Sequence, residues 1–300
     1  MLTNFKELEN YVLSQNMKKR IALANAHDEP ALSAVVNARR KGVVEGTLVG
    51  KKDEIIAMLH EMGESENDYE IVDFDGEELE AAKIAVQLVR EGKADIPMKG
   101  ILQTSNFARA ILNKETGLIP TGGRRLVSQC GIFEYEGRFV MITDAAINIA
   151  PDVETQIGIV ENALPVARAL GIDCPKVAVL SAVENVTEKM PSTVSAAAIK
   201  ERGIPGCMVT GPLALDGAIS MESVKHKSIK DPVAGQADIL LVPFIEIGNV
   251  LYKAVTYIAG KTVASTICGA SCPVIITSRA DTPDSKYYSI LLAVLRCLKA

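Results

Sequence analysis

Ser278 and Arg279 stand at the end of an apolar segment, residues 274–277, where a strand would deliver side chains to a ligand. An arginine in that place offers a planar set of donors that suits phosphate, or an oxygen atom on which negative charge develops. Asp281 and Asp284 follow in a short loop that leads to a predicted helix. Capping of that helix is the structural alternative for these two carboxyl groups.

A second cation, Lys253, ends the stretch 243–253. In this stretch Gly248 is predicted to break a strand, and Asn249 is the predicted N-cap of the helix that follows. The helical period predicts one apolar face, from which Lys253 points away, made of Val250, Leu251, Ala254, Val255 and Ile258. Lys253 is therefore either a solvated lysine or a lysine at a binding cleft, and the spacing leaves both open.

Polar residues in three earlier stretches also have a structural and a functional interpretation. Thr104 and Ser105 precede a helical run, where hydroxyl and N–H groups either cap the helix or bind phosphate. Arg125, with Arg124 beside it, follows a glycine pair that forms an anion-binding turn or an exposed one. Asn148 comes just after an apolar strand, at the edge where open α/β sheets bind ligands, and a capped turn is its alternative.

Strand-like and helix-like segments alternate along the chain and must position these residues. Repeated strand–helix units predict a parallel sheet that is covered on both faces. An antiparallel hairpin is predicted at 130–143, with a Glu136–Gly137 turn. The other predicted strands are 21–26, 46–50, 69–74, 176–181, 206–210, 238–243 and 273–277. The predicted helices are 28–40, 52–62, 77–91, 153–170, 192–202, 249–259 and 284–299, with a short amphipathic helix before residue 20.

Composition excludes several classes of function. A length of 300 residues favours two domains, and the net charge of −5 argues against non-specific nucleic-acid binding. No apolar run reaches the ~18 residues that a membrane helix needs. The six cysteines come without a secretion signal, so we expect reduced thiols in a cytoplasmic protein. The three histidines lack metal-ligand spacing and no G-x-G-x-x-G is present, so no metal or nicotinamide cofactor is expected.

Six stretches, taken together and in order, carry a resemblance to a known family. They are 144–149, 176–181, 211–216, 233–238, 243–253 and 277–279. Over residues 99–300 the chain resembles the phosphate acetyl/butyryl transferase family, and the stretch 99–105 is more similar to its phosphate butyryltransferase branch. The resemblance implies reversible transfer of a short acyl group, butyryl favoured, from coenzyme A to inorganic phosphate. Phosphate would attack the thioester directly in a ternary complex, with both partners as substrates and no cofactor.

The resemblance also implies a fold and an assembly. The expected fold class is α/β, with two three-layer α/β domains, a cleft between them and an isocitrate dehydrogenase-like architecture. The first domain would comprise residues 1–130 and 267–300, and the second residues 131–266. A homodimer or a higher homo-oligomer is expected.

The resemblance implies roles for individual residues of this chain. Arg279 would stabilise the carbonyl oxygen or bind phosphate, Ser278 would hydrogen-bond the leaving thiolate, and Lys253 would be the lysine of the cleft. Substrate binding is expected at Thr104, Ser105, Arg125, Asn148 and Asn249. The acetyltransferases carry an aspartate about two helical turns after the serine–arginine pair, and Ser285 stands there in this chain. Asp281 and Asp284 are therefore the candidates for the acid/base.

Three alternatives stay open. The first is a phosphate acetyltransferase that prefers acetyl-CoA. The second is an NAD- and metal-dependent dehydrogenase of related fold, which would need a cluster of aspartates that the candidate stretches lack. The third is an inactive acyl-CoA-binding homologue, which should have lost Ser278 or Arg279, although this chain has both.

Overall fold

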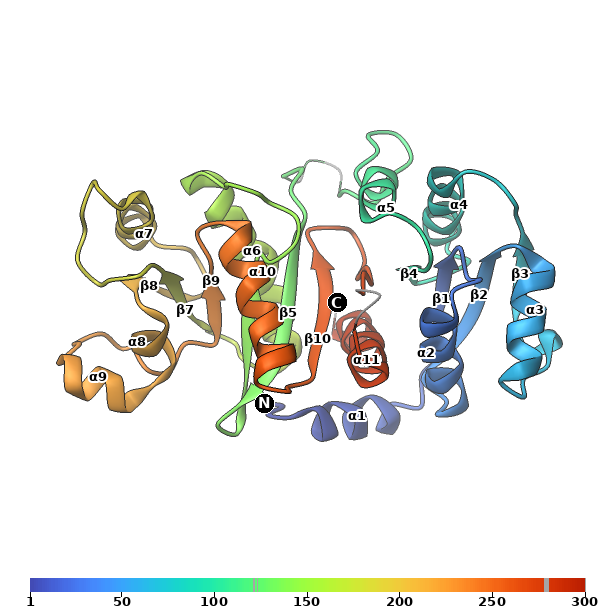
Figure 1. Cartoon of the computed structure of the whole chain (residues 1–300), viewed down its shortest axis with the longest axis horizontal. Helices are drawn as coiled ribbons and strands as arrows, with labels where there is room; N and C mark the ends of the chain where they lie inside the picture. Colours follow the sequence, from blue (N-terminus) through green and yellow to red (C-terminus); the bar gives the residue numbers. More distant parts are fainter. Residues whose placement is uncertain (121, 123, 278–280, 300) are drawn as a thin grey trace. The chain divides into compact units, whose positions relative to one another are not determined.

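The computed structural model describes residues 1–120, 122, 124–277 and 281–299 (Figure 1). The chain forms two compact α/β units. The central unit comprises Met1–Asn4 and Leu126–Val263, and the flanking unit comprises Phe5–Arg125 and Ala264–Ala300. The chain thus leaves the flanking unit once and returns to it for its last helix.

The flanking unit has a four-stranded parallel sheet in the order β3-β2-β1-β4. Strand β1, one of its two inner strands, is buried at every position from Ile21 to Ala24, as expected for a parallel strand covered on both faces. The sheet is extended by isolated bridges that pair Met98 with Ile275 and Ile267 with Val274. The strands are β1 (Lys19–Ala24), β2 (Val44–Gly50), β3 (Glu70–Asp73) and β4 (Ile96–Lys99).

Helices cover this sheet and one another. Helix α4 packs on β1, β2 and β4, α2 packs on β2, and α11 packs against both α2 and α1. The helices are α1 (Phe5–Ser14), α2 (Glu29–Arg40), α3 (Lys52–Glu61), α4 (Glu78–Arg90), α5 (Thr104–Ile111) and α11 (Pro283–Lys299), with a 3₁₀ turn at Glu66–Asp68.

The central unit combines an antiparallel hairpin with parallel strands. Strands β5 (Ser128–Tyr135) and β6 (Arg138–Thr143) pair antiparallel, and the order continues β6-β9-β7-β8 in parallel. The parallel strands are β7 (Lys176–Leu180), β8 (Met208–Leu213) and β9 (Ile239–Leu241). Strand β10 (Val263–Cys268) begins where the chain passes back to the flanking unit.

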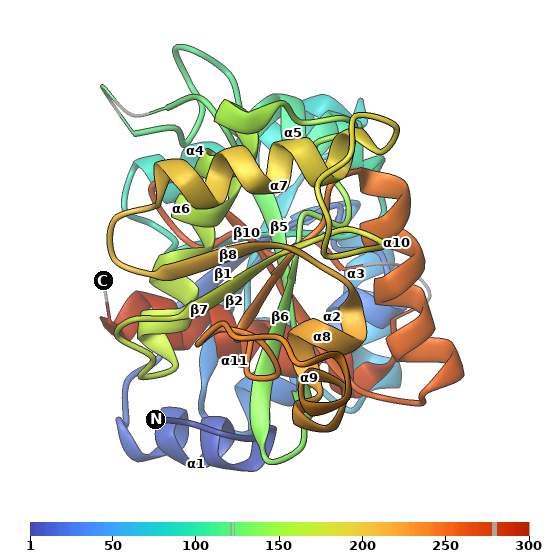
Figure 2. The same cartoon turned by 90° about the vertical axis from the view of Figure 1, so that its left-hand side faces the viewer.

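The helices of the central unit pack around this sheet. Helix α6 (Val153–Ala169) lies on β5, β6 and β9, and α7 (Pro191–Arg202) lies along β8 and β7, as Figure 2 shows. Helix α10 (Ile245–Lys253) contacts β6 and continues into a π-helical turn, Ala254–Ile258. Two short helices, α8 (Leu215–Ile219) and α9 (Met221–Lys227), complete the unit.

Most of the predicted elements are confirmed, including the hairpin with its Glu136–Gly137 turn. Two of the predicted elements differ from the structure, and three elements were not predicted. Residues 273–277 make single bridges and not a continuous strand. The predicted helix at 249–259 begins earlier, at Ile245. Strand β10 was not predicted. The helices α8 and α9 were not predicted either, because five and seven residues are too few to show a helical period.

Candidate functional site

The polar site of the central unit is built around the carboxyl group of Asp144, directly after β6. This residue is 2% exposed. Its Oδ1 accepts hydrogen bonds from the backbone N–H groups of Gln129, Ala146 and Ile147 at 2.9–3.2 Å. Its Oδ2 accepts from the N–H of Asn148 at 3.0 Å and from Asn148 Nδ2 at 2.6 Å. Asp144 therefore fixes the loop that leaves the sheet.

Burial and hydrogen bonding act in opposite directions on Asp144. Burial raises the pKa of this carboxyl group, and the hydrogen bonds from Ala146, Asn148, Gln129 and Ile147 lower it; the result is a raised pKa. The charged form depends on these donors, because water is excluded from the site.

Asn148 is held by the same network. Its Nδ2 donates to the carbonyl oxygen of Val127 at 2.9 Å as well as to Asp144. Asn148 is half-buried, and both of these bonds use the same end of the amide. The sequence placed Asn148 correctly at the carboxyl end of a strand, and the structure gives it an orientation.

Asn249 has a different place from the predicted one. Helix α10 begins at Ile245 with Phe244 as its N-cap, so Asn249 lies inside the helix and is not an N-cap. Its Nδ2 donates to the carbonyl oxygen of Ala145 at 3.3 Å. Gly248 does not break a strand; a Cβ atom there would lie 2.5 Å from the carbonyl oxygen of Asp144. Glycine is required because α10 approaches the Asp144 loop closely.

Lys253 is exposed at the end of α10, one helical turn after Asn249. The predicted apolar face is only partly correct. Leu251 and Val255 pack against the core, whereas Val250 and Ile258 are 67% and 86% exposed. The structure thus brings Asn148, Asn249 and Lys253 onto two neighbouring elements of the central unit.

In the flanking unit, Thr104 and Ser105 are exposed in the first turn of α5. Capping by their side chains, the structural alternative, is not what the structure shows, because Gln103 is the N-cap residue and its own side chain makes no capping hydrogen bond. A carboxylate lies at this end, since Glu78 Oε2 accepts from the N–H of Gln103 at 2.8 Å and from Asn106 Nδ2 at 2.9 Å.

A buried lysine that the sequence did not single out holds the loop before α5. Lys99 is 6% exposed, and its Nζ donates to the carbonyl oxygens of Gly100 at 3.1 Å and Leu102 at 3.0 Å. Carbonyl partners for a buried ammonium orient the turn that presents Thr104. Lys99 begins the stretch 99–105 that carries the resemblance to the butyryltransferase branch, and the apolar strand before it was the sequence signal of its burial.

Arg125 binds the other end of α5. Its Nη2 donates to the carbonyl oxygen of Leu112, the C-cap of that helix, at 2.7 Å, and the rest of the side chain is exposed. A cation at a helix C-terminus satisfies a free carbonyl group. Thr104 and Arg125 are therefore at opposite ends of one helix.

Ser278 and Arg279 lie outside the described residues. Beyond them, Asp281 is half-buried, Asp284 is exposed and Ser285 is 2% exposed. The cap of α11 comes from Thr282, whose Oγ1 accepts from the N–H of Ser285 at 3.1 Å. The carboxyl groups of Asp281 and Asp284 are not needed for this bond.

Two other features are absent from the described ranges. There, no three histidine, cysteine, aspartate or glutamate side chains gather closely enough to hold a metal ion. None of the helices in that part of the chain is both long and apolar enough to cross a membrane.

Comparison with known proteins places these features in a family context. Residues 77–294 match the model of the family described as phosphate acetyl/butaryl transferase. The chain is 46% identical to phosphate butyryltransferase of Clostridium acetobutylicum, over 98% of each chain. It is 38% identical to phosphate acetyltransferase of Thermotoga maritima, over 94% of this chain and 97% of that one.

A solved structure agrees with these relatives. A branched-chain phosphotransacylase from Enterococcus faecalis superposes with a TM-score of 0.83 at 36% identity, covering 93% of this chain and 99% of that one. The likeness extends over both units of the chain.

Proposed function

The chain belongs to the phosphate acetyl/butyryl transferase family, and we propose that it transfers a butyryl group reversibly between coenzyme A and inorganic phosphate. The observation that carries this proposal is the 46% identity to a phosphate butyryltransferase over nearly the whole of both chains. In the reaction, a phosphate oxygen attacks the thioester carbonyl carbon. The carbon–sulfur bond then breaks, and coenzyme A leaves as the thiolate.

The proposed roles follow from where charge changes. Negative charge grows on the carbonyl oxygen and on the leaving sulfur, so donors must point at both atoms. We assign the carbonyl oxygen to Arg279 and the thiolate to Ser278. Lys253 is proposed to bind an anionic group of a substrate, which its exposure supports.

Phosphate is assigned to Thr104 and Ser105. They are exposed in the first turn of α5, where N–H groups and the helix dipole favour an anion. Arg125 is proposed to attract an anionic substrate through its positive charge, at the C-terminal end of α5. Asn148 and Asn249 are proposed to contact the acyl-CoA, and Asp281 or Asp284 to protonate the thiolate. No metal or redox cofactor takes part in this scheme.

The test is phosphate-dependent release of thiol from a series of acyl-CoAs. Each buried CH₂ contributes ~0.8 kcal/mol, so two more methylenes should raise kcat/KM for butyryl-CoA over acetyl-CoA by roughly tenfold. Reactions without phosphate are the control for hydrolysis. A higher kcat/KM for acetyl-CoA would favour the acetyltransferase alternative, to which the Thermotoga maritima relative points.

We also propose that the protein is a homodimer. An exposed apolar strip on α10 and the turn after it supports this proposal. The strip consists of Ile247, Val250, Tyr257 and Ile258, which are 46–86% exposed. Ile149, 69% exposed, adjoins the strip, because its carbonyl oxygen accepts from the N–H of Ile245. In a two-fold symmetric dimer, the strip of one subunit would pack against the same strip of the other subunit.

A further inference from the structure

A pocket of about 550 Å³ lies within the flanking unit, beside the start of α11. Helix α2 contributes Ser33, Asn37 and Arg40 to its wall, and α11 and the residues before it contribute Asp281, Pro283 and Lys286. The α2 residues that line this pocket take no part in the proposed reaction.

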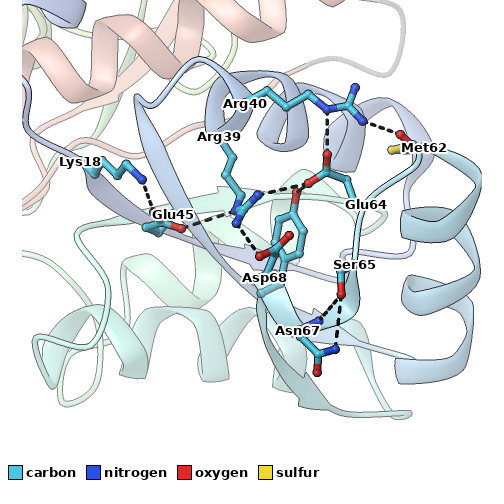
Figure 3. A network of polar contacts seen from close by, with 10 residues as sticks. Lys18, Arg39, Arg40, Glu45, Met62, Glu64, Ser65, Asn67 and Asp68 are labelled. Carbon is cyan, nitrogen blue, oxygen red and sulfur yellow. Dashed lines mark hydrogen bonds and ion pairs between the residues drawn. The ribbon is translucent and has the colours of Figure 1, made fainter.

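Arg40 has a fixed position at the pocket wall. Its Nε lies 2.7 Å from Glu64 Oε1, and its Nη2 donates to the carbonyl oxygen of Met62, which also lines the pocket (Figure 3). Glu29 lines the pocket as well, so the pocket carries charges of both signs.

Lys286 is the buried lysine of this pocket. It is 3% exposed, and its Nζ donates to the backbone carbonyl oxygen of Asp281 at 2.5 Å. Burial lowers the pKa of Lys286, although the charges of Asp281, Asp28 and Glu29 raise it, and the net direction is downward. A larger fraction of this lysine is therefore the free amine, the form that attacks carbonyl groups.

Lys227 shows the contrast within the same chain. Its Nζ lies 2.9 Å from Asp216 Oδ1 and 2.9 Å from Glu184 Oε1. Hydrogen bonds to Asp216 and Glu184 raise its pKa, so it stays an ammonium ion at neutral pH. It is exposed to any reagent in solution, and it is the matched control for a lysine whose reactivity comes from its pocket.

We propose that Lys286 is acylated on Nζ, inside this pocket, by the acyl phosphate that the enzyme makes. The inference rests on the proposed function, which supplies that reagent. The amine lone pair forms a bond to the carbonyl carbon, the bond from that carbon to the phosphate oxygen breaks, and inorganic phosphate leaves. The amine proton passes to solvent, and a neutral amide replaces the ammonium ion.

The wall of the pocket offers apolar surface to the acyl chain of the product. With a volume of about 550 Å³ the pocket has room for a short acyl chain, and Pro283 and Met62 give its wall apolar surface. The amide N–H can keep the hydrogen bond to the Asp281 carbonyl oxygen. The modification removes one positive charge that faces Asp281 and Glu29.

The test incubates the full-length protein with synthetic butyryl phosphate and measures butyrylation of each lysine by peptide mass spectrometry. We expect the fraction modified at Lys286 to be several times that at Lys227. Equal or lower modification at Lys286 would overturn the proposal. Equal modification by butyryl-CoA without phosphate would overturn the assignment of acyl phosphate as the donor.

A variant at the pocket wall tests whether butyryl phosphate reaches Lys286 through the pocket. Asn37 is exposed on α2 at the pocket wall, so Asn37→Trp should obstruct the pocket and reduce modification of Lys286 severalfold, with Lys227 unchanged. Gln87→Trp, on the exposed side of α4, is the matched control and should change neither. If Asn37→Trp keeps its melting temperature and Lys286 reacts as before, the pocket is not the route.

The thiol-release assay on the same samples separates the two proposals. Because butyryl phosphate is supplied, labelling does not depend on catalysis. An active enzyme without preferred labelling at Lys286 would refute only the acylation. A protein that releases no thiol from any acyl-CoA would refute the proposed function.

Discussion

A single carboxyl group, that of Asp144, accepts five hydrogen bonds and fixes the loop that carries Asn148. The sequence predicted where Asn148 lies, because a polar residue after an apolar strand is a local signal. It did not predict the donor from Gln129, which is 15 residues away and comes from the paired strand β5. Contacts across a sheet depend on pairing, which local spacing does not encode.

Asp144→Asn should show what this carboxyl group contributes. An amide group has one acceptor oxygen, so the –NH₂ would face at least the two donors of Asn148 that now bind Oδ2. Leaving buried donors unsatisfied costs about 1–3 kcal/mol each, so we expect a loss of at least about 2 kcal/mol in urea unfolding. KM for acyl-CoA should also rise, because Asn148 loses its position.

Asp152→Asn is the matched control for that substitution. Asp152 is exposed, and it caps α6 by accepting from the N–H of Thr155 at 2.8 Å. Asparagine caps a helix about as well as aspartate does, so stability should hardly change. Equal effects of the two substitutions would show that Asp144 has no special role.

Arg279→Ala tests the proposed transition-state donor. Loss of one preorganised donor lowers kcat on the order of 10²–10³-fold, and that is the expected loss. Arg279→Lys should recover only part, because an ammonium group does not reproduce the planar fork. If kcat holds and only KM for phosphate rises, Arg279 binds phosphate in the ground state. A folded Arg279→Ala protein with wild-type kinetics would remove the residue from the site.

At the scale of elements, α10 shows where the sequence misleads. Gly248 was interpreted as a strand break because glycine is rare inside regular elements. In the structure it lies within the helix, where its missing side chain lets α10 approach the carbonyl oxygen of Asp144. The local role of a glycine and its role in tertiary packing give the same sequence signal, and only the fold distinguishes them.

Helix α1 is attached to the rest of the flanking unit through a buried carboxylate. Glu9 is 6% exposed and accepts from Lys41 Nζ at 2.8 Å, Lys6 Nζ at 3.0 Å and Tyr287 Oη at 2.9 Å. Burial raises the pKa of Glu9, but the hydrogen bonds from Lys41, Lys6 and Tyr287 outweigh it and lower the pKa to about 2. Ionised Glu9 thus joins α1 to α2 and α11.

This lowered pKa predicts a pH dependence of stability. A carboxyl group whose pKa is depressed on folding stabilises above its unfolded pKa, here 4.5, and loses that effect as pH falls toward about 2. The stabilisation at neutral pH is on the order of 3 kcal/mol. Glu9→Gln should therefore be less stable at neutral pH, by a difference that shrinks below about pH 4.5 in urea titrations.

The control for Glu9 is an exposed carboxylate in another helix. Glu80 forms an exposed ion pair with Lys83 at 2.7 Å, and such pairs contribute about 0–1 kcal/mol. Glu80→Gln should change stability little at any pH. A difference between wild type and Glu9→Gln that stays constant from neutral pH to acid would contradict the linkage.

At the scale of the whole molecule, the α/β class followed from the alternation of strand and helix signals. The hairpin of β5 and β6 was predicted too, because its Glu136–Gly137 turn is a local signal. The exposure of Val250 and Ile258 was not predicted, although both were assigned to an apolar face. A helical period shows which residues share a side of a helix, whereas the neighbouring elements decide which side is buried.

That exposed strip leads to the prediction for the assembly. Val250→Glu would place a carboxylate in the strip. In a two-fold interface each of the two subunits would then bury one such carboxylate without a partner charge. We expect wild type to sediment with twice the mass of the chain, and Val250→Glu to shift toward the monomer at the same concentration. Val194→Glu, at a 42%-exposed valine on α7 of the same unit, should stay dimeric. A monomeric wild type, or a Val250→Glu variant that stays fully dimeric, would show that this strip does not hold two copies together.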